Sequence, residues 1–425
     1  MSSKVYLIPA ADDEPNESVS RKARAAYLQL GLQEKLEKDD FVALKIHFGE
    51  KNNTGYINPH WLQGLIREIQ QKTPRAFLTD SNTLYVGNRS NSIDHLRLAW
   101  SHGFTPDIVG IPVIIADGLT GRDVHETKRA PSTPSALSTP GSTHTPSASG
   151  APPTPSASGA PRPPSAPHSP SAPHTPLAPR TSSTARSTAH TPPTPTSLSR
   201  IKSAKISGAF LSSDAFLCLT HVTGHVQTGI GAAIKNMGMG CASRAGKLDQ
   251  HSNVHPRVSA KACRNCSLCF DYCPADAIVQ AEGHVEIVDE KCIGCGACLV
   301  VCKYSAIKFR WDEDARRLQE KMAEYALTVQ QIYKGKIGFI NFLTKITKDC
   351  DCMSKDQPRI VEDIGILAST DAVAIDKASA DLVFAHSKGK DMFRAGYDLD
   401  WSYQLKHGEH IGLGSQDYEL IKVSD

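Results

Sequence analysis

The sequence predicts an α/β fold in which a mainly parallel sheet is flanked by helices. Apolar strands alternate with amphipathic helices over most of the 425 residues, a pattern typical of sheets that helices cover on both faces. The alternation stops twice, first in a long segment of Ser, Thr, Pro, Ala and His, and later in a short segment rich in cysteine. We therefore expect one α/β domain interrupted by a disordered insert and by a small α+β module.

The first 127 residues show the strand and helix signals most clearly. Strands are expected at KVYLIPA (4–10), FVALKIHFG (41–49), RAFLTD (75–80) and IPVIIADG (111–118). A helix is expected at 58–72, where apolar residues recur at helical spacing behind Asn58 as the N-cap and Pro59 in the first turn. A second helix, at 92–104, should end at Gly103.

The insert, residues 128–200, has a composition that cannot bury a core. The nonapeptide TPSASGAPP at 145–153 recurs almost unchanged at 154–162. Such a segment is predicted to be disordered. Its Ser/Thr-Pro pairs are compatible with phosphorylation, but a drifted tandem repeat tolerated on a surface loop is the simpler interpretation.

The α/β pattern resumes after the insert and again after the cysteine-rich segment. The expected elements are a strand-rich stretch (204–222), a glycine-rich stretch (223–247), a long amphipathic helix (314–333), a strand (336–343) and a largely apolar helix (369–387). The predicted plan places parts of the α/β domain at 1–127, 201–258 and 311–425, the insert at 128–200 and the cysteine module at 259–310.

Eight of the twelve cysteines lie in the module, in two copies of the motif C-x-x-C-x-x-C-x-x-x-C. The copies occupy 263–273 and 292–302. This regular spacing suits the thiolate ligands of iron–sulfur cubanes, whereas tetrahedral zinc would use two C-x-x-C pairs and leave the third cysteine of each copy unused. Gly294 and Gly296 should let the backbone approach a cluster and donate N–H groups to sulfur. The stretch between the copies, 279–290, alternates in polarity and suits a β-hairpin.

The module resembles the bacterial two-cluster ferredoxin, in which the fourth cysteine of each copy binds the other cluster. The resemblance implies two [4Fe–4S] clusters. The first would be bound by Cys263, Cys266, Cys269 and Cys302, and the second by Cys292, Cys295, Cys298 and Cys273. The proline that follows the fourth cysteine in that family is present as Pro274, but Lys303 stands at the second position. Two adjacent clusters favour electron transfer over a purely structural use.

Polar residues follow several predicted strands, where α/β sheets place their binding sites. The candidates for binding or protonating a substrate are His47, Glu50, Asp80 and Lys235. For a histidine such as His47, a hydrogen-bonded structural role is the simpler alternative. The glycines around Lys235, in GIGAAIKNMGMG, are compatible with a phosphate-binding turn or with a tightly packed turn. Burial between apolar neighbours would lower the pKa of Lys235.

Cys350 and Cys352 flank an aspartate in the motif DCDCM. Three interpretations are open: a metal chelate with Cys241 and Cys218 as further ligands, a reactive thiol, or a pair of unliganded loop cysteines.

Two other polar positions have expectations of their own. His221 and His225 lie four residues apart, but Gly224 between them indicates a loop and not a metal-binding helix face. Asp376, inside an apolar helix, is expected to form a site wall or to pair with Lys377 or another base.

Several segments together resemble iron–sulfur centre proteins built on a domain of unknown function, DUF362. They are VALKIHFGE, LTDSNTLYVG, HVTGH, GAAIKNMGMGCASRAGKLDQHS, EKMAEYA, CDC and EDIGILASTDAVAIDKASADLV, together with the two cysteine runs. The resemblance covers nearly the whole chain outside the insert and departs at Ala372, where the family is expected to have proline. It implies an iron–sulfur redox protein without an agreed substrate.

Composition narrows the classes of partner. Lys and Arg number 47 and Asp and Glu 44, for a net charge of +3, which predicts no general affinity for nucleic acid or an anionic membrane. No apolar run approaches the roughly 20 residues that span a bilayer, and the N-terminus has neither a secretory signal nor a transit peptide. We expect a soluble cytoplasmic protein, in a reducing compartment where clustered cysteines bind metal.

The favoured interpretation is a redox protein whose two clusters relay electrons to or from a substrate site in the α/β domain. Its partner would be a redox protein or a small-molecule substrate. The alternative is a non-enzymatic ferredoxin-like carrier or assembly factor whose α/β domain docks a protein. A third interpretation, in which the clusters only hold the fold, predicts that redox state changes no activity.

Overall fold

The computed structural model describes residues 2–128, 199–251, 256–308 and 314–423, except Pro274, Ile293 and Cys295. The insert expected at 128–200 lies almost entirely outside the described residues, so its disorder stays a prediction.

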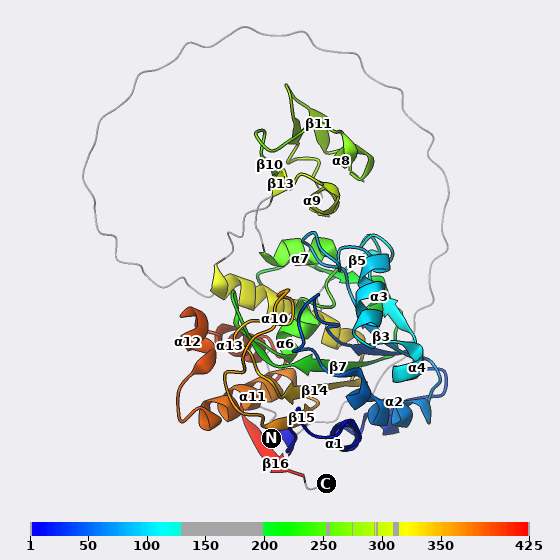
Figure 1. The fold of residues 1–425 in the computed structure, drawn as a ribbon, viewed down its shortest axis with the longest axis vertical. Coiled ribbons are helices and arrows are strands. Elements are labelled where there is room, and N and C mark those ends of the chain that lie inside the picture. Colours follow the sequence, from blue (N-terminus) through cyan, green and yellow to red (C-terminus); the bar gives the residue numbers. More distant parts are fainter. Residues whose placement is uncertain are drawn as a thin grey trace, which may run out of the picture. The chain divides into compact units, whose positions relative to one another are not determined.

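An eight-stranded sheet forms the centre of the α/β domain (Figure 1). In sheet order the strands are β16 (Tyr418–Lys422), β1 (Ser3–Ile8), β15 (Gly365–Ser369), β14 (Ile337–Leu343), β7 (Ala215–His221), β2 (Val42–Lys45), β3 (Ala76–Asp80) and β4 (Val113–Ile115). Within this sheet of described residues, β15 alone runs antiparallel to its neighbours, and the other five pairings are parallel. The predicted mainly parallel α/β fold is confirmed.

Helices of the α/β domain flank the sheet on both faces. Their bounds are α1 (Asn16–Leu28), α2 (Gln63–Gln70), α3 (Ser92–Ser101), α4 (Pro106–Val109), α5 (Gly208–Leu211), α6 (Ala233–Gly238), α7 (Arg244–His251), α10 (Ala315–Ile332), α11 (Ala372–His386), α12 (Met392–Tyr397) and α13 (Tyr403–His410), with 3-10 turns at Leu32–Glu34 and Pro59–Leu62. Two short helices, α8 (Leu268–Asp271) and α9 (Ala297–Val301), belong to the cysteine module. None of the described helices combines the length and the apolar character needed to cross a bilayer.

One strand shows how the sheet separates two hydrophobic cores. In β7, Ala215, Leu217 and Leu219 belong to a core shared with α1 and α2. Phe216 and Cys218 belong to a second core shared with α6, α10 and α11. Successive strand side chains point to opposite faces, so a strand buried on both sides must be apolar throughout.

In the described residues, four pairs of short strands lie outside the eight-stranded sheet. They are β5 (Val124–Thr127) with β6 (Ala204–Ser207), β8 (Thr223–His225) with β9 (Gly229–Gly231), β10 (Arg257–Val258) with β13 (Ile307–Lys308), and β11 (Ile278–Gln280) with β12 (Val285–Ile287). The last pair is the hairpin expected between the two cysteine motifs.

The Asp376 carboxylate holds α6 in place, which corrects the expected pairing with Lys377. It accepts hydrogen bonds of 2.8 Å from the N–H groups of Ala233 and Ile234, at the start of α6, and one of 3.0 Å from Asn341. Burial raises the pKa of Asp376 to about 7, while Lys377 pairs with a surface aspartate. These two N–H groups are already occupied by a carboxylate, which favours the packed-turn interpretation of the glycine-rich segment.

The two cysteine motifs share a backbone path. Asn265 and Ser267 in the first copy have φ values of 50° and 59°, and Gly294 and Gly296 stand 29 positions later with φ values of 65° and 70°. These left-handed conformations suit glycine and are tolerated by asparagine. The internal repeat in the sequence is therefore also a repeat in conformation.

Candidate functional site

The module gathers its cysteines around two small cavities. The first is lined by Cys263, Cys266, Cys269 and Cys302, and the second by Cys273, Cys292 and Cys298. The remaining cysteine of the two motifs, Cys295, lies outside the described residues. Each cavity thus takes a thiol from the other motif.

The surroundings of these sulfur atoms fit an iron–sulfur cluster. Backbone N–H groups of Ala277 and Ala306 donate to the Sγ atoms of Cys273 and Cys302, at 3.3 and 3.2 Å. Such bonds favour the thiolate form that binds iron. Burial and then the neighbouring thiols raise the pKa of Cys269, a repulsion between thiolates that a bound iron cluster would offset.

The module contacts the α/β domain through apolar and polar groups. Leu84 and Leu248 belong to the same hydrophobic cluster as Cys269 and Cys298. The Arg122 guanidinium donates to a carbonyl of the module at 2.7 Å. Leu84 also lines a much larger cavity in the α/β domain, so the cluster module and that cavity share a wall residue.

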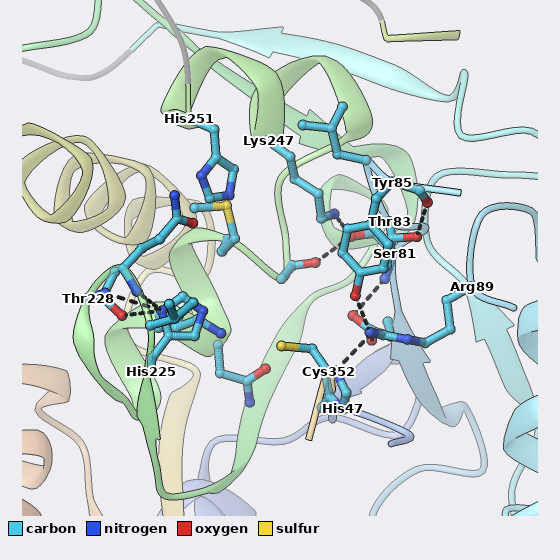
Figure 2. Close-up of a pocket in the computed structure, with 18 of the residues that line it drawn as sticks. His47, Ser81, Thr83, Tyr85, Arg89, His225, Thr228, Lys247, His251 and Cys352 are labelled. Carbon is cyan, nitrogen blue, oxygen red and sulfur yellow. Dashed lines mark hydrogen bonds and ion pairs between the residues drawn. The ribbon is translucent and has the colours of Figure 1, made fainter. Parts of the chain in front are cut away.

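The larger cavity, of about 570 Å³, lies where β2 and β3 end (Figure 2). This volume is typical of small-molecule sites. Its polar lining consists of Lys45, His47, Asp80, Ser81, Thr83, Tyr85, Arg89, His225, Gln227, Thr228, Lys235, Asn236, Lys247, His251 and Cys352, and its apolar lining includes Leu84, Val226, Met239, Leu318 and Met353. The predicted residues His47, Asp80 and Lys235 are therefore brought together.

Asp80 forms a buried ion pair with a lysine that the sequence interpretation missed. Lys45 Nζ lies 3.0 Å from Asp80 Oδ1 and donates to Asn236 Oδ1 at 2.7 Å. Burial alone would raise the pKa of Asp80, but Lys45, followed by His95, His47 and Arg89, holds it well below its usual value. A lysine inside an apolar strand such as VALKI is itself a signal, because a buried ammonium needs a partner.

Arg89 connects Glu50 to the cavity. Its guanidinium pairs with the Glu50 carboxylate at 3.0 Å, contacts His47 Nε2 at 2.8 Å and donates to the Tyr85 hydroxyl at 2.6 Å. Glu50 does not line the cavity, so its predicted direct contact with a substrate is replaced by contact through Arg89. Burial and then Arg89 lower the pKa of His47 well below its ordinary value, which keeps the ring neutral.

Lys235 and Lys247 are the two other cations of the cavity. Lys247 Nζ donates to Ser81 Oγ and to a backbone carbonyl, each at 2.6 Å. Among the residues that the structure describes, Lys235 Nζ has no hydrogen bond or ion pair. Burial, and then repulsion from Lys45 and Arg89, lowers the pKa of Lys235 to about 8.

The expected grouping of Cys241 with Cys350 and Cys352 is wrong. Cys241 is fully buried in the core, where burial raises its thiol pKa well above the ordinary value. In the described part of the chain, the third group beside Cys350 and Cys352 is His225. His221, four residues earlier, instead pairs with Asp351 at 2.9 Å, so the two histidines form no metal-binding pair.

Comparison with known families assigns the chain. The model of the family described as "Domain of unknown function (DUF362)" matches residues 42–139 and 182–381. The chain belongs to the DUF362 family. This DUF362 protein is also 46% identical over 50 residues to an iron–sulfur protein of Rhodospirillum rubrum, covering 11% of this chain and 26% of that protein.

Other similarities of this DUF362 protein are short or distant. It is 40% identical over 52 residues to the electron transport protein HydN of Escherichia coli K12, covering 12% of this chain and 30% of HydN. The chain thus spans less than a third of both curated relatives. A solved Thermotoga maritima structure aligns with a TM-score of 0.38 at 8% identity, covering 89% of this chain and 60% of that one, a likeness that says nothing about function.

Proposed function

We propose that this DUF362 protein is an iron–sulfur oxidoreductase that exchanges electrons with a small anionic substrate in the large cavity. Two [4Fe–4S] clusters in the module would each supply one electron at a time. The proposal rests on one observation: Leu84 belongs to the hydrophobic cluster that contains Cys269 and Cys298, and it also lines the large cavity that Lys235 and Lys247 face. The short similarities to an iron–sulfur protein and an electron transport protein support it.

The charges of the cavity favour an anionic substrate. Lys45 is neutralised by Asp80 and Arg89 by Glu50, which leaves Lys235 and Lys247 facing a cavity with no second carboxylate in its lining. Cationic side chains in a partly apolar cavity suit a carboxylate or phosphate joined to an apolar body.

The cavity residues would divide the work between orientation and proton transfer. Lys235, with a pKa of about 8, holds a proton that it can release near neutral pH, as a proton donor coupled to electron transfer should. Asp80 keeps its charge and holds Lys45, while Glu50 positions Arg89. Lys235 is thus the residue that anchors the anion and donates the proton.

Anion binding should weaken as pH rises through about 8. Sulfate is a suitable probe because its charge stays constant, and its affinity should fall between pH 7 and 9 as Lys235 and Lys247, each with a pKa lowered by burial to about 8, lose their protons. At pH 7, Lys235→Met should weaken binding about tenfold, or about 1.4 kcal/mol, and Lys235→Arg should lose less affinity than the parent protein between pH 7 and 9. Isothermal titration calorimetry measures both.

A control substitution at a surface lysine shows whether sulfate affinity depends on Lys235 itself or on the net charge of the protein. Lys377→Met removes an ammonium that pairs with Asp381 on α11 and should leave sulfate affinity unchanged. Equal affinity of Lys235→Met and the parent protein at pH 7 would contradict the assigned role.

The reaction itself is tested by electron transfer. Full-length protein, reduced anaerobically, is mixed with a panel of carboxylate and phosphate acceptors, and reoxidation is followed by visible absorbance. We expect at least one acceptor to reoxidise the parent protein and Lys377→Met equally fast, and Lys235→Met much more slowly. Reoxidation that is insensitive to Lys235 in every case would place the reaction outside this cavity.

A further inference from the structure

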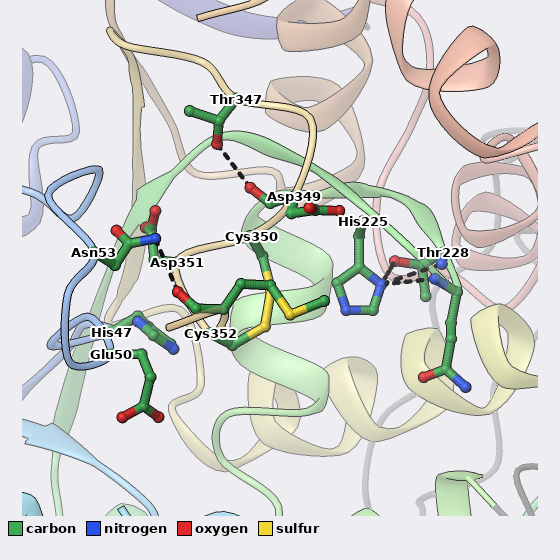
Figure 3. Close-up of a disulfide and its surroundings, with 12 residues drawn as sticks. His47, Glu50, Asn53, His225, Thr228, Thr347, Asp349, Cys350, Asp351 and Cys352 are labelled. Atoms are coloured by element: carbon green, nitrogen blue, oxygen red, sulfur yellow. Dashed lines mark hydrogen bonds between the residues drawn. A yellow bond between two sulfur atoms is a disulfide. The ribbon is translucent and has the colours of Figure 1, made fainter. Parts of the chain in front are cut away.

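Cys350 and Cys352 are joined by a disulfide in the loop after β14 (Figure 3). Cys352 lines the large cavity. Cys350 lines a smaller neighbouring cavity, and the two cavities share His47, Lys235 and Asn236. The sulfur pair therefore lies at the wall of the proposed substrate site.

His225 is oriented toward this pair by its own turn. The backbone N–H groups of Gln227 and Thr228 each donate to His225 Nδ1 at 3.2 Å. The Thr228 hydroxyl, which donates to the Ile230 carbonyl at 2.9 Å, also lies 2.9 Å from His225 Nδ1. One ring nitrogen lies within 4.8 Å of both sulfur atoms, and Figure 3 shows the ring between Thr228 and the disulfide.

The bond between the two sulfurs decides between two uses of the three residues. Two thiolates and an imidazole are a common metal-binding set, but here the two cysteines form a disulfide, which offers no thiolate to a metal. Once the disulfide is reduced, the neighbouring imidazole can hydrogen-bond to a thiol or thiolate. Burial, followed by Lys235 and His251, lowers the pKa of His225 well below its ordinary value, so the ring is neutral and not doubly protonated.

We propose that Cys350 and Cys352 form a redox-active disulfide that passes electrons between the iron–sulfur module and a two-electron anionic acceptor. The transfer of electrons from the iron–sulfur module to this disulfide depends on the proposed function, whereas the redox activity of the disulfide itself does not depend on it. Two one-electron transfers from the module and two protons break the S–S bond and give two thiols. The dithiol then releases two electrons and two protons to the acceptor, and the S–S bond forms again.

The two sulfurs have different roles in this cycle. Cys352 faces the large cavity and is the sulfur that meets the acceptor, while Cys350 lines the smaller cavity and closes the disulfide. Lys235, which borders both cavities, offers the cation that favours a thiolate at either position.

A single tryptic peptide reports the state of the pair. Cleavage after Lys348 and Lys355 releases residues 349–355, whose cysteines are Cys350 and Cys352 alone. Full-length holoprotein is incubated anaerobically with reduced methyl viologen or with dithiothreitol, quenched in acid, denatured, alkylated and analysed by mass spectrometry. Both cysteines should be labelled after either treatment and neither before it, with Cys218, a free thiol, labelled throughout.

A cluster-free variant separates this proposal from the proposed function. In Cys263→Ser/Cys292→Ser protein, dithiothreitol should still open the disulfide, whereas reduced viologen should open it far more slowly. If viologen fails in the holoprotein while dithiothreitol succeeds, the redox pair stands and the electron relay of the proposed function fails.

Two results would overturn the proposal itself. Labelling of both cysteines before any reduction, with a stoichiometric metal retained by the cluster-free variant, would show a metal site. A pair that no reductant opens in the native protein would be a structural crosslink. Cys352→Ser should keep its iron content and give a single labelled cysteine in either redox state.

Discussion

Replacing Cys302 by serine should remove the cluster bound by the first cysteine motif, although Cys302 belongs to the second. Its sulfur lines the same cavity as Cys263, Cys266 and Cys269, and a cubane that lacks one of four thiolates is lost or becomes labile. Iron should fall from about eight to about four atoms per chain. Cys218→Ala, which changes a free cysteine in the core of the α/β domain, should leave the iron content unchanged.

Double substitutions distinguish crosswise from local ligation. If Cys302 and Cys263 serve one cluster, Cys263→Ser/Cys302→Ser should lose no more iron than either single variant. Cys298→Ser/Cys302→Ser should then lose nearly all of it. The opposite pattern would mean that each motif binds its own cluster, against the arrangement of the two cavities.

Asp80→Asn should destabilise the α/β domain by about 3–5 kcal/mol. The carboxylate is the buried counter-charge of Lys45 at 3.0 Å, and Arg89 Nη1 and His95 Nε2 lie 4.0 and 3.8 Å from it. Its removal leaves a buried ammonium without a negative partner. Urea denaturation followed by tryptophan fluorescence measures the change in the free energy of unfolding.

Two controls make this prediction specific to burial. Asp381→Asn breaks a surface pair with Lys377 and should cost less than about 1 kcal/mol. Lys45→Met/Asp80→Leu removes both charges and should cost less than Asp80→Asn alone. A cost below about 1 kcal/mol for Asp80→Asn would show that the pair is not the buried unit described here.

The same pair sets a pH dependence. The pKa of Asp80 is lower in the folded than in the unfolded chain, so its stabilising contribution is present at neutral pH. That contribution is lost only as pH falls below about 4, the ordinary value for aspartate. Asp80→Asn should lose this part of the acid dependence.

Hydrophobic pattern predicted the sheet well because burial on both faces leaves little choice of residue. The runs around Val42, Phe77, Phe216 and Phe339 all became central strands. Two strands of the sheet were missed. The five residues of β15 are buried but too few to stand out beside the apolar helix that follows, and the edge strand β16 is only half-buried and carries no continuous apolar signal.

The sequence was enough to group two candidate residues whose positions are determined by the strands that they follow. His47 and Asp80 follow neighbouring parallel strands and therefore meet at one edge of the sheet. His225 and the Cys350–Cys352 pair are more than a hundred residues apart, and no local periodicity encodes their contact. Glu50 was expected to contact the substrate, because the sequence alone does not show that Arg89 pairs with the Glu50 carboxylate and lines the cavity in its place.

The central claim is that two cubane clusters share the eight cysteines of the module. The most direct test is to measure iron, acid-labile sulfide and the EPR spectrum of full-length protein purified anaerobically. We predict about eight irons and about eight sulfides per chain, with two magnetically interacting signals after reduction. One or two zinc ions in place of iron, or about four irons with a single isolated signal, would contradict it.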